Sequence, residues 1–335
     1  MSKKKVLITG ITGQDGSYLA EFLLKKGYEV SGIVRKTSHE DYANIGHIQD
    51  ELKLFQGDLL DPVSLREIIQ KVNPDEVYNL ASQSHPSESF KQPIHTAEIT
   101  GIGAHRVLDA TLDVNPKTKF YQASSSEMFG WVREIPQDEE TPFNPANPYA
   151  AAKLYAYCMT KIYRKSYNMF ATNGILFNHE SPRRHLGFVT QKVAYAAACA
   201  SLGIKNSEHL NEEGELVVKD GKVSLGNLEA KRDWGYAGDY VEAMWLMMQA
   251  DEPDDFVVAT GETHTIQELC EEAFNYVNLD WNDHVIIDKR FIRPTETGPL
   301  IGNPAKAKKI LGWEPKTKFK ELVKIMVEAH LARLK

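Results

Sequence analysis

The chain has few of the features that mark secreted, membrane-bound or disulfide-stabilised proteins. Its 335 residues include three widely spaced cysteines and no CxxC pair, so no disulfide framework is expected. No apolar run approaches the ~18 residues of a membrane span. The apolar stretch that follows the first lysines is too short for a signal peptide. We therefore expect a cytoplasmic protein with no membrane partner.

Excess positive charge and metal-binding spacings are missing as well. The net charge is −7 at pH 7, which argues against broad binding to nucleic acids. The 11 histidines show no HxxH or HExxH spacing, so no metal site is expected. Hydrophobic residues make up 42% and charged residues 25%, which is ordinary for a globular protein with one large or two ordinary domains.

The first half of the chain alternates short apolar runs with segments of helical period. Strands are expected at 5–10, 28–35, 52–58, 74–82 and 118–125. Helices are expected at 16–26, 61–72, 95–113 and from Asn147 onward. Continuous apolar strands that alternate with helices indicate βαβ units. The predicted fold class is α/β, with a Rossmann-like, doubly wound parallel sheet.

After about Gly174 this rhythm changes, and a smaller α/β C-terminal lobe is expected to fold onto the sheet. One more strand runs into a polar, arginine-bearing loop. Residues 205–222 are polar and interrupted by glycines, which is typical of a hairpin or loop, and the EEGE stretch at 212–215 is expected to be solvated. We expect core packing for Trp234, Trp245, Met247 and Met248.

Glycines 10, 13 and 16 lie between the first strand and the first helix. Such glycines permit a tight turn, a close approach of a pyrophosphate to the backbone, and close packing of helix on strand. The helix N-terminus also favours an anion. The segment predicts dinucleotide binding, and the alternative is a purely structural glycine turn.

The second strand ends in residues that bear on the choice of cofactor. An acidic residue there would bind the ribose 2′-hydroxyl of NAD, but this chain has Arg35 and Lys36, followed by Thr37 and Ser38. A cation suits the 2′-phosphate of NADP, which we favour. The alternative is a solvated basic loop.

The next two strands end in further candidate cofactor contacts. Asp58 is a candidate for the adenine edge, with Leu59 against the ring, although Asp58 could instead cap the helix that starts near Pro62. Small residues at 79–84 would let the backbone run beside the nicotinamide half.

The fifth strand ends "YQASSSEMFG", which brings three serines and Glu127 to the carboxyl edge of the sheet, where open α/β folds bind ligands. Tyr149 and Lys153 follow on one face of a helix, four residues apart. Alone, the pair could be packing and a solvated charge. If Lys153 lies beside the phenol and an oxidised nicotinamide adds its charge, the pKa of Tyr149 falls and the tyrosine can take a proton from a substrate alcohol.

In this order, these motifs resemble the extended short-chain dehydrogenase/reductases. The segments "GITGQDGSYL", "YNLASQSH", "FYQASSSEMFG", "NPYAAAKLYAY", "NGILFNHESPRR", "RDWGYAGDYV" and "LGWEP" further resemble the GDP-mannose 4,6-dehydratase family, from near residue 6 to near residue 330. The resemblance implies a catalytic set of Ser125, Glu127, Tyr149 and Lys153. It also implies an NADP-binding domain at 1–175, to which some later segments return, and a nucleotide-sugar-binding lobe that is mainly 176–335.

The resemblance, together with the motifs above, implies the remaining ligand contacts. The expected NADP-binding residues are Gly10, Thr12, Gly13, Gln14, Asp15, Gly16, Arg35, Ser38, Asp58, Leu59, Leu80, Ala81, Ser82, Ser84, Lys153, His179 and Arg184. The expected contacts to the nucleotide-sugar are Ser82, Ser125, Glu127, Tyr149, Asn178, Val189, Lys192, Arg232, Arg293 and Glu296. Arg232 and Arg293 are candidates to neutralise the diphosphate.

A hydro-lyase of this kind would convert GDP-mannose to GDP-4-keto-6-deoxy-mannose and water. NADP would take hydride from C4 and return it to C6. Tyr149 would act as the base at C4, and Ser125 would hold or relay a proton there. Glu127 would take the C5 proton and protonate the departing C6 hydroxyl, a role that a simple epimerase does not need.

The chain also departs from the family's pattern, which leaves the sugar and the reaction open. His185 and Leu186 follow the paired arginines where a Gly-Glu-Thr segment is usual, His95 replaces a tyrosine, and 205–222 is longer than the family's connection. GDP-manno-heptose is therefore a second candidate substrate. The chain could instead be an NADP-dependent nucleotide-sugar epimerase or 4-keto reductase, or a catalytically idle NADP-binding partner protein. The resemblance also implies a homo-oligomer, either a dimer or a tetramer.

Overall fold

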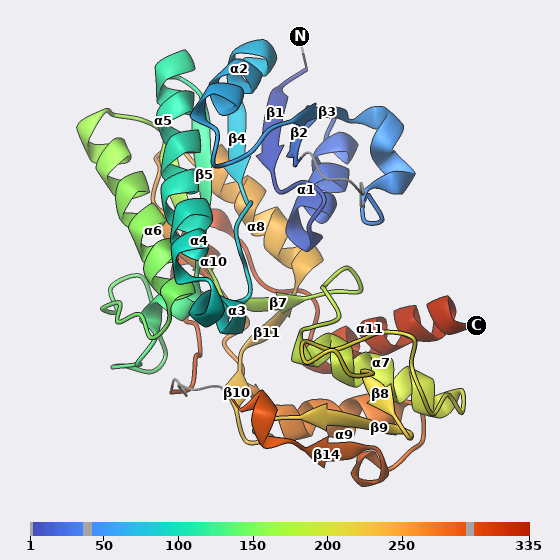
Figure 1. Cartoon of the computed structure of the whole chain (residues 1–335). Coiled ribbons are helices and arrows are strands. Elements are labelled where there is room, and N and C mark those ends of the chain that lie inside the picture. Colours follow the sequence, from blue (N-terminus) through green and yellow to red (C-terminus); the bar gives the residue numbers. More distant parts are fainter. Residues whose placement is uncertain (1–2, 36–41, 293–297) are drawn as a thin grey trace.

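A seven-stranded parallel sheet forms the centre of the computed structural model, which describes residues 3–35, 42–292 and 298–335. The strand order is β12-β6-β5-β4-β1-β2-β3 (Figure 1). The strands are β1 (Lys5–Thr9), β2 (Glu29–Val34), β3 (Lys53–Gln56), β4 (Glu76–Asn79), β5 (Lys119–Ser125), β6 (Ala171–Leu176) and β12 (Asp255–Val258). The predicted doubly wound α/β sheet is confirmed.

The strand order reverses between β1 and β4, which pair in parallel with Val6–Thr9 beside Glu76–Asn79. From β1 the chain moves outward through β2 and β3, then returns to β4 on the other side and continues through β5 and β6. Such a switch point opens a crevice at the carboxyl ends of the strands, where ligands of this fold class bind.

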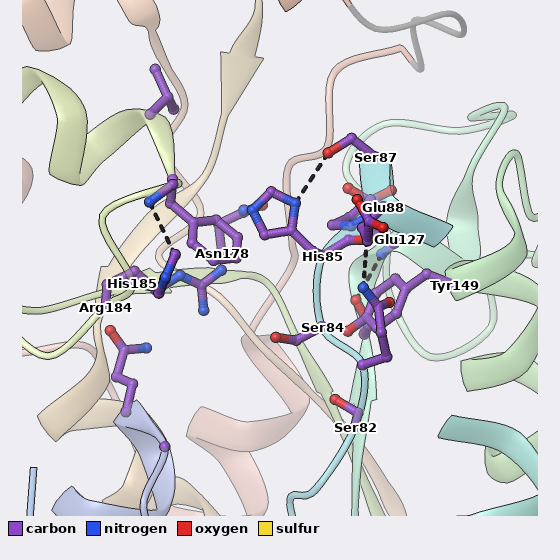
Figure 2. Close-up of a pocket in the computed structure, with 18 of the residues that line it drawn as sticks. Ser82, Ser84, His85, Ser87, Glu88, Glu127, Tyr149, Asn178, Arg184 and His185 are labelled. Carbon is purple, nitrogen blue, oxygen red and sulfur yellow. Dashed lines mark hydrogen bonds between the residues drawn. The ribbon is translucent and has the colours of Figure 1, made fainter. Parts of the chain in front are cut away.

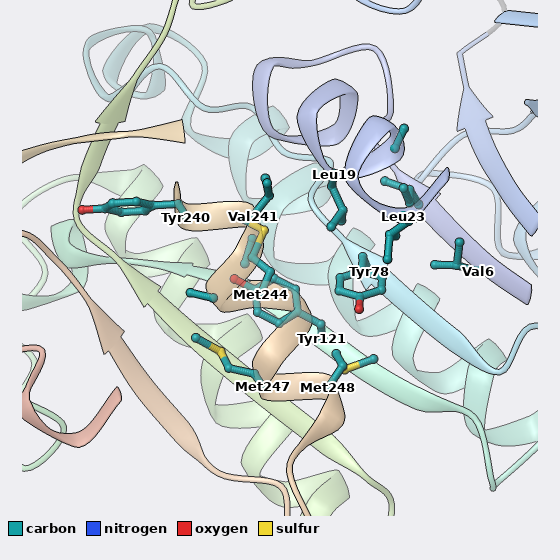
Figure 3. Close-up of a cluster of buried hydrophobic side chains, with 14 of the residues drawn as sticks. Val6, Leu19, Leu23, Tyr78, Tyr121, Tyr240, Val241, Met244, Met247 and Met248 are labelled. Atoms are coloured by element: carbon teal, nitrogen blue, oxygen red, sulfur yellow. The ribbon is translucent and has the colours of Figure 1, made fainter. Parts of the chain in front are cut away.

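Helices cover both faces of the sheet. On one face, α1 (Gln14–Lys25) and α8 (Ala237–Gln249) pack over side chains such as Tyr78 and Tyr121 (Figure 3). On the other face lie α2 (Pro62–Val72), α5 (Ala104–Val114) and α6 (Pro148–Ser166). Because the central strands β1, β4, β5 and β6 are covered on both sides, they are almost entirely buried, which explains the continuous apolar runs of the sequence.

The remaining segments form a second lobe with its own apolar core. Its helices are α7 (Val189–Ser201), α9 (Ile266–Tyr276) and α11 (Phe319–Leu334), which pack on a small sheet of β8 (Val218–Lys219), β9 (Lys222–Leu225) and β14 (Val285–Ile287). The antiparallel β8–β9 pair forms a hairpin at the end of the polar 205–222 segment, and its second strand extends beyond that segment to Leu225.

Short strands and helices connect this lobe to the sheet. Parallel pairing joins β7 (Asn178–Glu180) to β11 (Trp234–Tyr236), and antiparallel pairing joins β10 (Lys231–Arg232) to β13 (His264–Thr265). The other short elements are η1 (Gly46–Glu51), α3 (Pro86–Lys91), η3 (Ser126–Phe129), η4 (Trp281–Asp283), η5 (Lys289–Phe291) and α10 (Ala305–Leu311). No helix within the described residues has the length and apolarity to cross a membrane.

The helix predicted at 95–113 is confirmed, because the backbone stays helical from Pro93 to Val114, although its middle is wound as a π-helix. It is divided into α4 (Pro93–Thr96), a π-helical stretch η2 (Ala97–Gly103) and α5. A Cβ at Gly101 would lie 3.3 Å from the carbonyl oxygen of Ala152 on α6, so this wide turn lies close against the neighbouring helix. Core packing is confirmed for Trp234, Met247 and Met248, and the partly buried Trp245 packs against the same core as the two methionines.

Candidate active site

A cavity of about 1140 Å³ extends from the carboxyl edge of the sheet to the second lobe. It brings together nearly all the site residues predicted from the sequence. Those that line it are Gly10, Thr12, Gly13, Gln14, Asp15, Gly16, Arg35, Asp58, Leu59, Leu80, Ala81, Ser82, Ser84, Ser125, Glu127, Tyr149, Lys153, Asn178, His179, Arg184, Val189, Lys192 and Arg232. Lys36, Thr37, Ser38, Arg293 and Glu296 lie outside the described residues.

The glycine loop forms one end of the cavity. Gly10 has a φ of +74°, and a Cβ there would lie 2.9 Å from the backbone nitrogen of Ala81. At Gly16 a Cβ would lie 2.2 Å from the carbonyl oxygen of Gly10, so any larger residue would push the loop away from α1. The loop is therefore held against both the end of β4 and the N-terminus of α1. This cradle fits a pyrophosphate.

Asp15 and His179 link the first turn of α1 to β7. The His179 Nε2 lies 2.8 Å from the Asp15 carboxylate, and its Nδ1 lies 2.7 Å from the Phe177 carbonyl oxygen. Burial opposes charge on both groups, but their mutual attraction and hydrogen bonding outweigh it. As a result, the pKa of Asp15 falls to about 2 and the pKa of His179 rises. The pair fixes this end of the cavity and limits the negative charge that Asp15 presents to it.

Glu127 is held in the middle of the cavity by the residue that starts the next helix. The Asn147 side chain caps α6 by accepting a hydrogen bond of 2.8 Å from the Ala150 N–H. Its amide nitrogen also donates to the Glu127 carboxylate at 2.9 Å. The Glu127 N–H donates to the Ser125 hydroxyl at 3.2 Å, and Glu127 is 7% exposed. One side chain thus positions both Glu127 and the helix that carries Tyr149.

Tyr149 and Lys153 face the cavity from the first turns of α6. Burial raises the pKa of Tyr149 to about 12, although a hydrogen bond with Ser125 acts to lower it. The Lys153 Nζ donates to the Ala123 carbonyl oxygen at 2.6 Å and lies 5.8 Å from the centre of the tyrosine ring. Burial lowers the pKa of Lys153 to about 8. Lys153 by itself therefore does not bring the tyrosine pKa below its ordinary value, and the predicted fall needs further positive charge.

The capping role considered for Asp58, at the start of α2, is wrong. Asp61 is the cap, because its carboxylate accepts from the backbone N–H groups of Val63 and Ser64. Asp58 instead accepts from the Leu60 N–H at 2.9 Å and lines the cavity. It remains a candidate for the adenine edge, with Leu59 beside it.

A wall of further polar side chains, which sequence reasoning did not assign to a ligand, also lines the cavity and consists of His85, Ser87, Glu88, His95 and His185. Figure 2 shows His85 between Tyr149 and Glu127 on one side and the group formed by Asn178, Arg184 and His185 on the other. The ring of His85 lies 3.0 Å from the Ser87 hydroxyl, and Glu88 and His95 also line the cavity. Ser87 and Glu88 belong to the short helix α3, which the sequence analysis did not predict, and this is why these two were missed.

The EEGE stretch is exposed at 212–214, as predicted, but two of its carboxylates form ion pairs. The Glu212 carboxylate pairs with the Lys192 ammonium at 2.6 Å, and Glu215 pairs with the Arg290 guanidinium at 2.9 Å. Glu212 and Glu213 line the cavity together with Lys192. No sequence signal pointed to these contacts, because the partners lie 20 and 75 residues away.

The fold and the Ser-Glu-Tyr-Lys arrangement define an extended short-chain dehydrogenase/reductase. A family model described as "GDP-mannose 4,6 dehydratase" matches residues 7–326. The chain is 50% identical to GDP-mannose 4,6 dehydratase 1 of Arabidopsis thaliana, over 98% of this chain and 90% of that protein. It therefore belongs to the GDP-mannose 4,6-dehydratase family, and the recognition made from the motifs is confirmed.

Solved structures share the fold at lower identity. A UDP-glucose 4-epimerase from Thermotoga maritima with UDP-glucose superposes with a TM-score of 0.85 at 23% identity, over 99% of this chain and 100% of that one. The structure of RMD from Pseudomonas aeruginosa complexed with NADPH superposes with a TM-score of 0.79 at 22% identity, again over 99% and 100%. Among the described residues, no group of three or more His, Cys, Asp or Glu side chains could hold a metal ion.

Proposed function

We propose that this protein removes water from a GDP-linked hexose, converting GDP-mannose to GDP-4-keto-6-deoxy-mannose. The observation that carries the proposal is the meeting of Glu127 with Ser125 and Tyr149 in one cavity. With NADP as the hydride acceptor, Ser125, Tyr149 and Lys153 would support oxidation at C4. A nearly buried carboxylate beside them adds the base and acid that an elimination across C5 and C6 requires.

Tyr149 serves C4 in this mechanism. Its phenol must lose a proton to accept one from the C4 hydroxyl, and burial opposes that loss. The Ser125 hydroxyl acts in the opposite direction, because its hydrogen bond with Tyr149 lowers the tyrosine pKa. Ser125 therefore both orients the C4 hydroxyl and stabilises the phenolate, and the positive charge of a bound oxidised nicotinamide would complete the effect.

Glu127 serves C5 and C6. Once C4 is a ketone, the C5 proton is acidic, and the carboxylate takes it. The same proton then leaves with the C6 hydroxyl as water, so the C5–H and C6–O bonds break and a C5=C6 double bond forms. When C6 regains hydride, C5 must regain a proton, which balances the one that Tyr149 took from the C4 hydroxyl. The Asn147 amide, which donates to the Glu127 carboxylate at 2.9 Å, holds this group in place for its work at both carbons.

NADP is the cofactor that we propose for this cycle; when bound, it holds the C4 hydride until C6 accepts it. The glycine cradle fits its pyrophosphate, because Gly10 and Gly16 leave no room for a Cβ. Arg35 lines the cavity where the second strand ends, and a cation there suits the 2′-phosphate. The NADPH complex of a protein with the same fold supports this choice. Asp58 and Leu59 would contact the adenine of NADP. His179 and Arg184 would contact the cofactor from the opposite side of the cavity.

A second candidate substrate, GDP-manno-heptose, is favoured by the polar wall of the cavity. Its additional hydroxyl-bearing carbon extends beyond C6, where a hexose offers no hydrogen-bonding group. His85, Ser87, Glu88 and His185 supply donors and acceptors along the cavity. These side chains would form hydrogen bonds with the extra hydroxyl group of the heptose, and the dehydration chemistry would be unchanged.

We also propose the two-part organisation expected from the sequence, with residues 1–175 binding NADP and 176–335 mainly binding the nucleotide-sugar. The separate apolar core around α7, α9 and α11 supports this division. The return of β12 and α8 to the main sheet fits the later segments assigned to the first domain. The three free cysteines fit the proposed cytoplasmic location.

We propose a homo-oligomer, either a dimer or a tetramer, in which Arg35 lies near a subunit contact. The exposed Arg35 at the end of β2 supports a contact here. Light scattering at assay concentration tests this proposal. A fully active monomer would contradict it.

The function is tested by incubating the NADP-loaded protein with GDP-mannose and, separately, with GDP-manno-heptose. Mass spectrometry should detect the loss of water from at least one of the two substrates, without net accumulation of NADPH. A product of unchanged mass would indicate an epimerase. Steady growth of reduced-nicotinamide absorbance would indicate a dehydrogenase without internal redox cycling.

A further inference from the structure

The polar segment 205–222 forms an ordered arm beside the end of the cavity that is remote from the glycine loop. Its two sides are joined by the Ser207 N–H to the Val218 carbonyl at 2.9 Å and by the Val217 N–H to the His209 carbonyl at 2.9 Å. At the tip, the Asn211 side chain accepts from the Glu213 and Glu215 N–H groups, each at 3.0 Å. The arm is therefore a built part of the cavity wall.

The arm is also anchored from the opposite side. Glu215 accepts two hydrogen bonds from Arg290, at 3.1 and 2.9 Å, in a bidentate geometry. Phe291, which follows Arg290, lines the cavity next to the arm. This anchoring fixes the position of Glu212, which lies between Asn211 and Glu215 in the tip.

Glu212 meets Lys192 at this end of the cavity. Both oxygens of its carboxylate lie within hydrogen-bond distance of the Lys192 ammonium, at 2.7 and 2.6 Å. The side chain of Lys192 is 7% exposed, whereas that of Glu212 is 36% exposed. The ammonium also lies 4.8 Å from the centre of the Phe291 ring. A donor, an acceptor and an aromatic ring therefore border one stretch of the cavity.

The charges here disfavour a diphosphate. Lys192 is already neutralised by Glu212, and Glu213 adds further negative charge to the same part of the cavity lining. These carboxylates would repel an anionic diphosphate. Arg232, which is 9% exposed and also lines the cavity, is a better partner for the diphosphate. What binds near Glu212 must therefore be uncharged and must offer both acceptors and donors.

We infer that Glu212 reads the guanine base of the substrate. This inference rests on the proposed GDP-sugar substrate. The guanine edge presents O6 as an acceptor beside the N1–H and N2–H donors, which matches an ammonium next to a carboxylate. Glu212 would accept from N1 and N2 while Lys192 donates to O6, and the Phe291 ring offers a face for stacking. Glu212 is thus a specificity-determining residue for the base, supplied by the arm.

The test is calorimetric titration of the NADP-loaded protein with GDP and with IDP, which lacks the 2-amino group. The variants are Glu212→Gln, Glu212→Ala and the control Glu208→Gln, an exposed arm residue that does not line the cavity. Wild type and Glu208→Gln should bind GDP about 10-fold more tightly than IDP, and both Glu212 variants should lose most of that preference. In turnover of GDP-mannose, Glu212→Gln should raise KM and leave kcat within about 2-fold.

Two results would overturn the inference while leaving the proposed dehydration intact. One is an unchanged GDP preference in the Glu212 variants. The other is tighter GDP binding by Glu212→Gln, which would make the carboxylate a gate that the substrate must displace. If wild type binds GDP with the expected preference but releases no water from a GDP-sugar, the proposed function fails and the base-reading role stands. If wild type does not bind GDP, both fail.

Discussion

Asn147 offers a way to separate the positioning of Glu127 from the stability of α6. Its side chain caps the helix through the Ala150 N–H and donates to the Glu127 carboxylate through its amide. Asn147→Ala removes both interactions. Asn147→Ser keeps a capping oxygen but has no group that can reach Glu127 in the same way.

The two losses have different sizes. Loss of the N-cap costs about 1 kcal/mol of folding free energy, so Asn147→Ala should lower the denaturation midpoint and Asn147→Ser should change it only slightly. A hydrogen bond to a charged group is worth roughly 1.5–3 kcal/mol, and about 1.4 kcal/mol corresponds to a tenfold rate change. Both variants should therefore lose roughly 10- to 100-fold in kcat, with a smaller effect on KM.

The assay pairs steady-state dehydration with a rapid-mixing measurement of reduced-nicotinamide absorbance. Because Glu127 acts after oxidation at C4, both Asn147 variants should form bound NADPH at a near-normal rate and then release product slowly. The reasoning is refuted if Asn147→Ser dehydrates GDP-mannose as fast as wild type. It is also refuted if the rate losses simply follow the stability losses across the two variants.

Further expectations concern the cofactor and pH. Arg35→Glu should weaken NADP binding by about 10-fold or more relative to NAD binding, while the exposed Arg133→Glu should alter neither; equal losses for both cofactors in fluorescence titrations would remove Arg35 from the 2′-phosphate site. Burial, followed by the charges of Arg333 and His209, lowers the pKa of His330 from 6.5 to about 4. The unfolded chain gains this proton before the folded chain does, so stability should fall by up to roughly 3 kcal/mol as the pH drops through that window. In denaturant titrations at several pH values, His330→Gln should show a flatter decline, and parallel curves for the two proteins would contradict this origin.

The features that were predictable from the sequence are those whose determinants are local. The glycines at 10, 13 and 16 follow an apolar strand directly, so the loop, its turn and the start of α1 could all be inferred from neighbouring residues. The same holds for Tyr149 and Lys153, whose spacing on α6 fixes their common face.

What the sequence could not predict depends on partners far along the chain. The π-helical turn near Gly101 packs against α6, which lies about 50 residues later in the chain. The local hydrophobic period predicts only a single helix and does not indicate this turn. The Glu212–Lys192 pair and the burial that raises the pKa of Tyr149 likewise exist only after folding. A run of acidic residues looks solvated until the cation that faces it is known.

The most direct test of the proposed dehydration is a single-turnover experiment on Glu127→Gln with NADP and GDP-mannose. Glu134→Gln, an exposed glutamate that does not line the cavity, is the matched control. General acid–base groups contribute about 10²–10⁴-fold to rate, so the elimination should be slowed by a readily measured factor. We predict that Glu127→Gln accumulates bound NADPH and a 4-keto sugar that has kept its water, whereas Tyr149→Phe forms neither. Release of water by Glu127→Gln at a near wild-type rate would contradict the role of Glu127 and leave only a tyrosine–lysine oxidation centre.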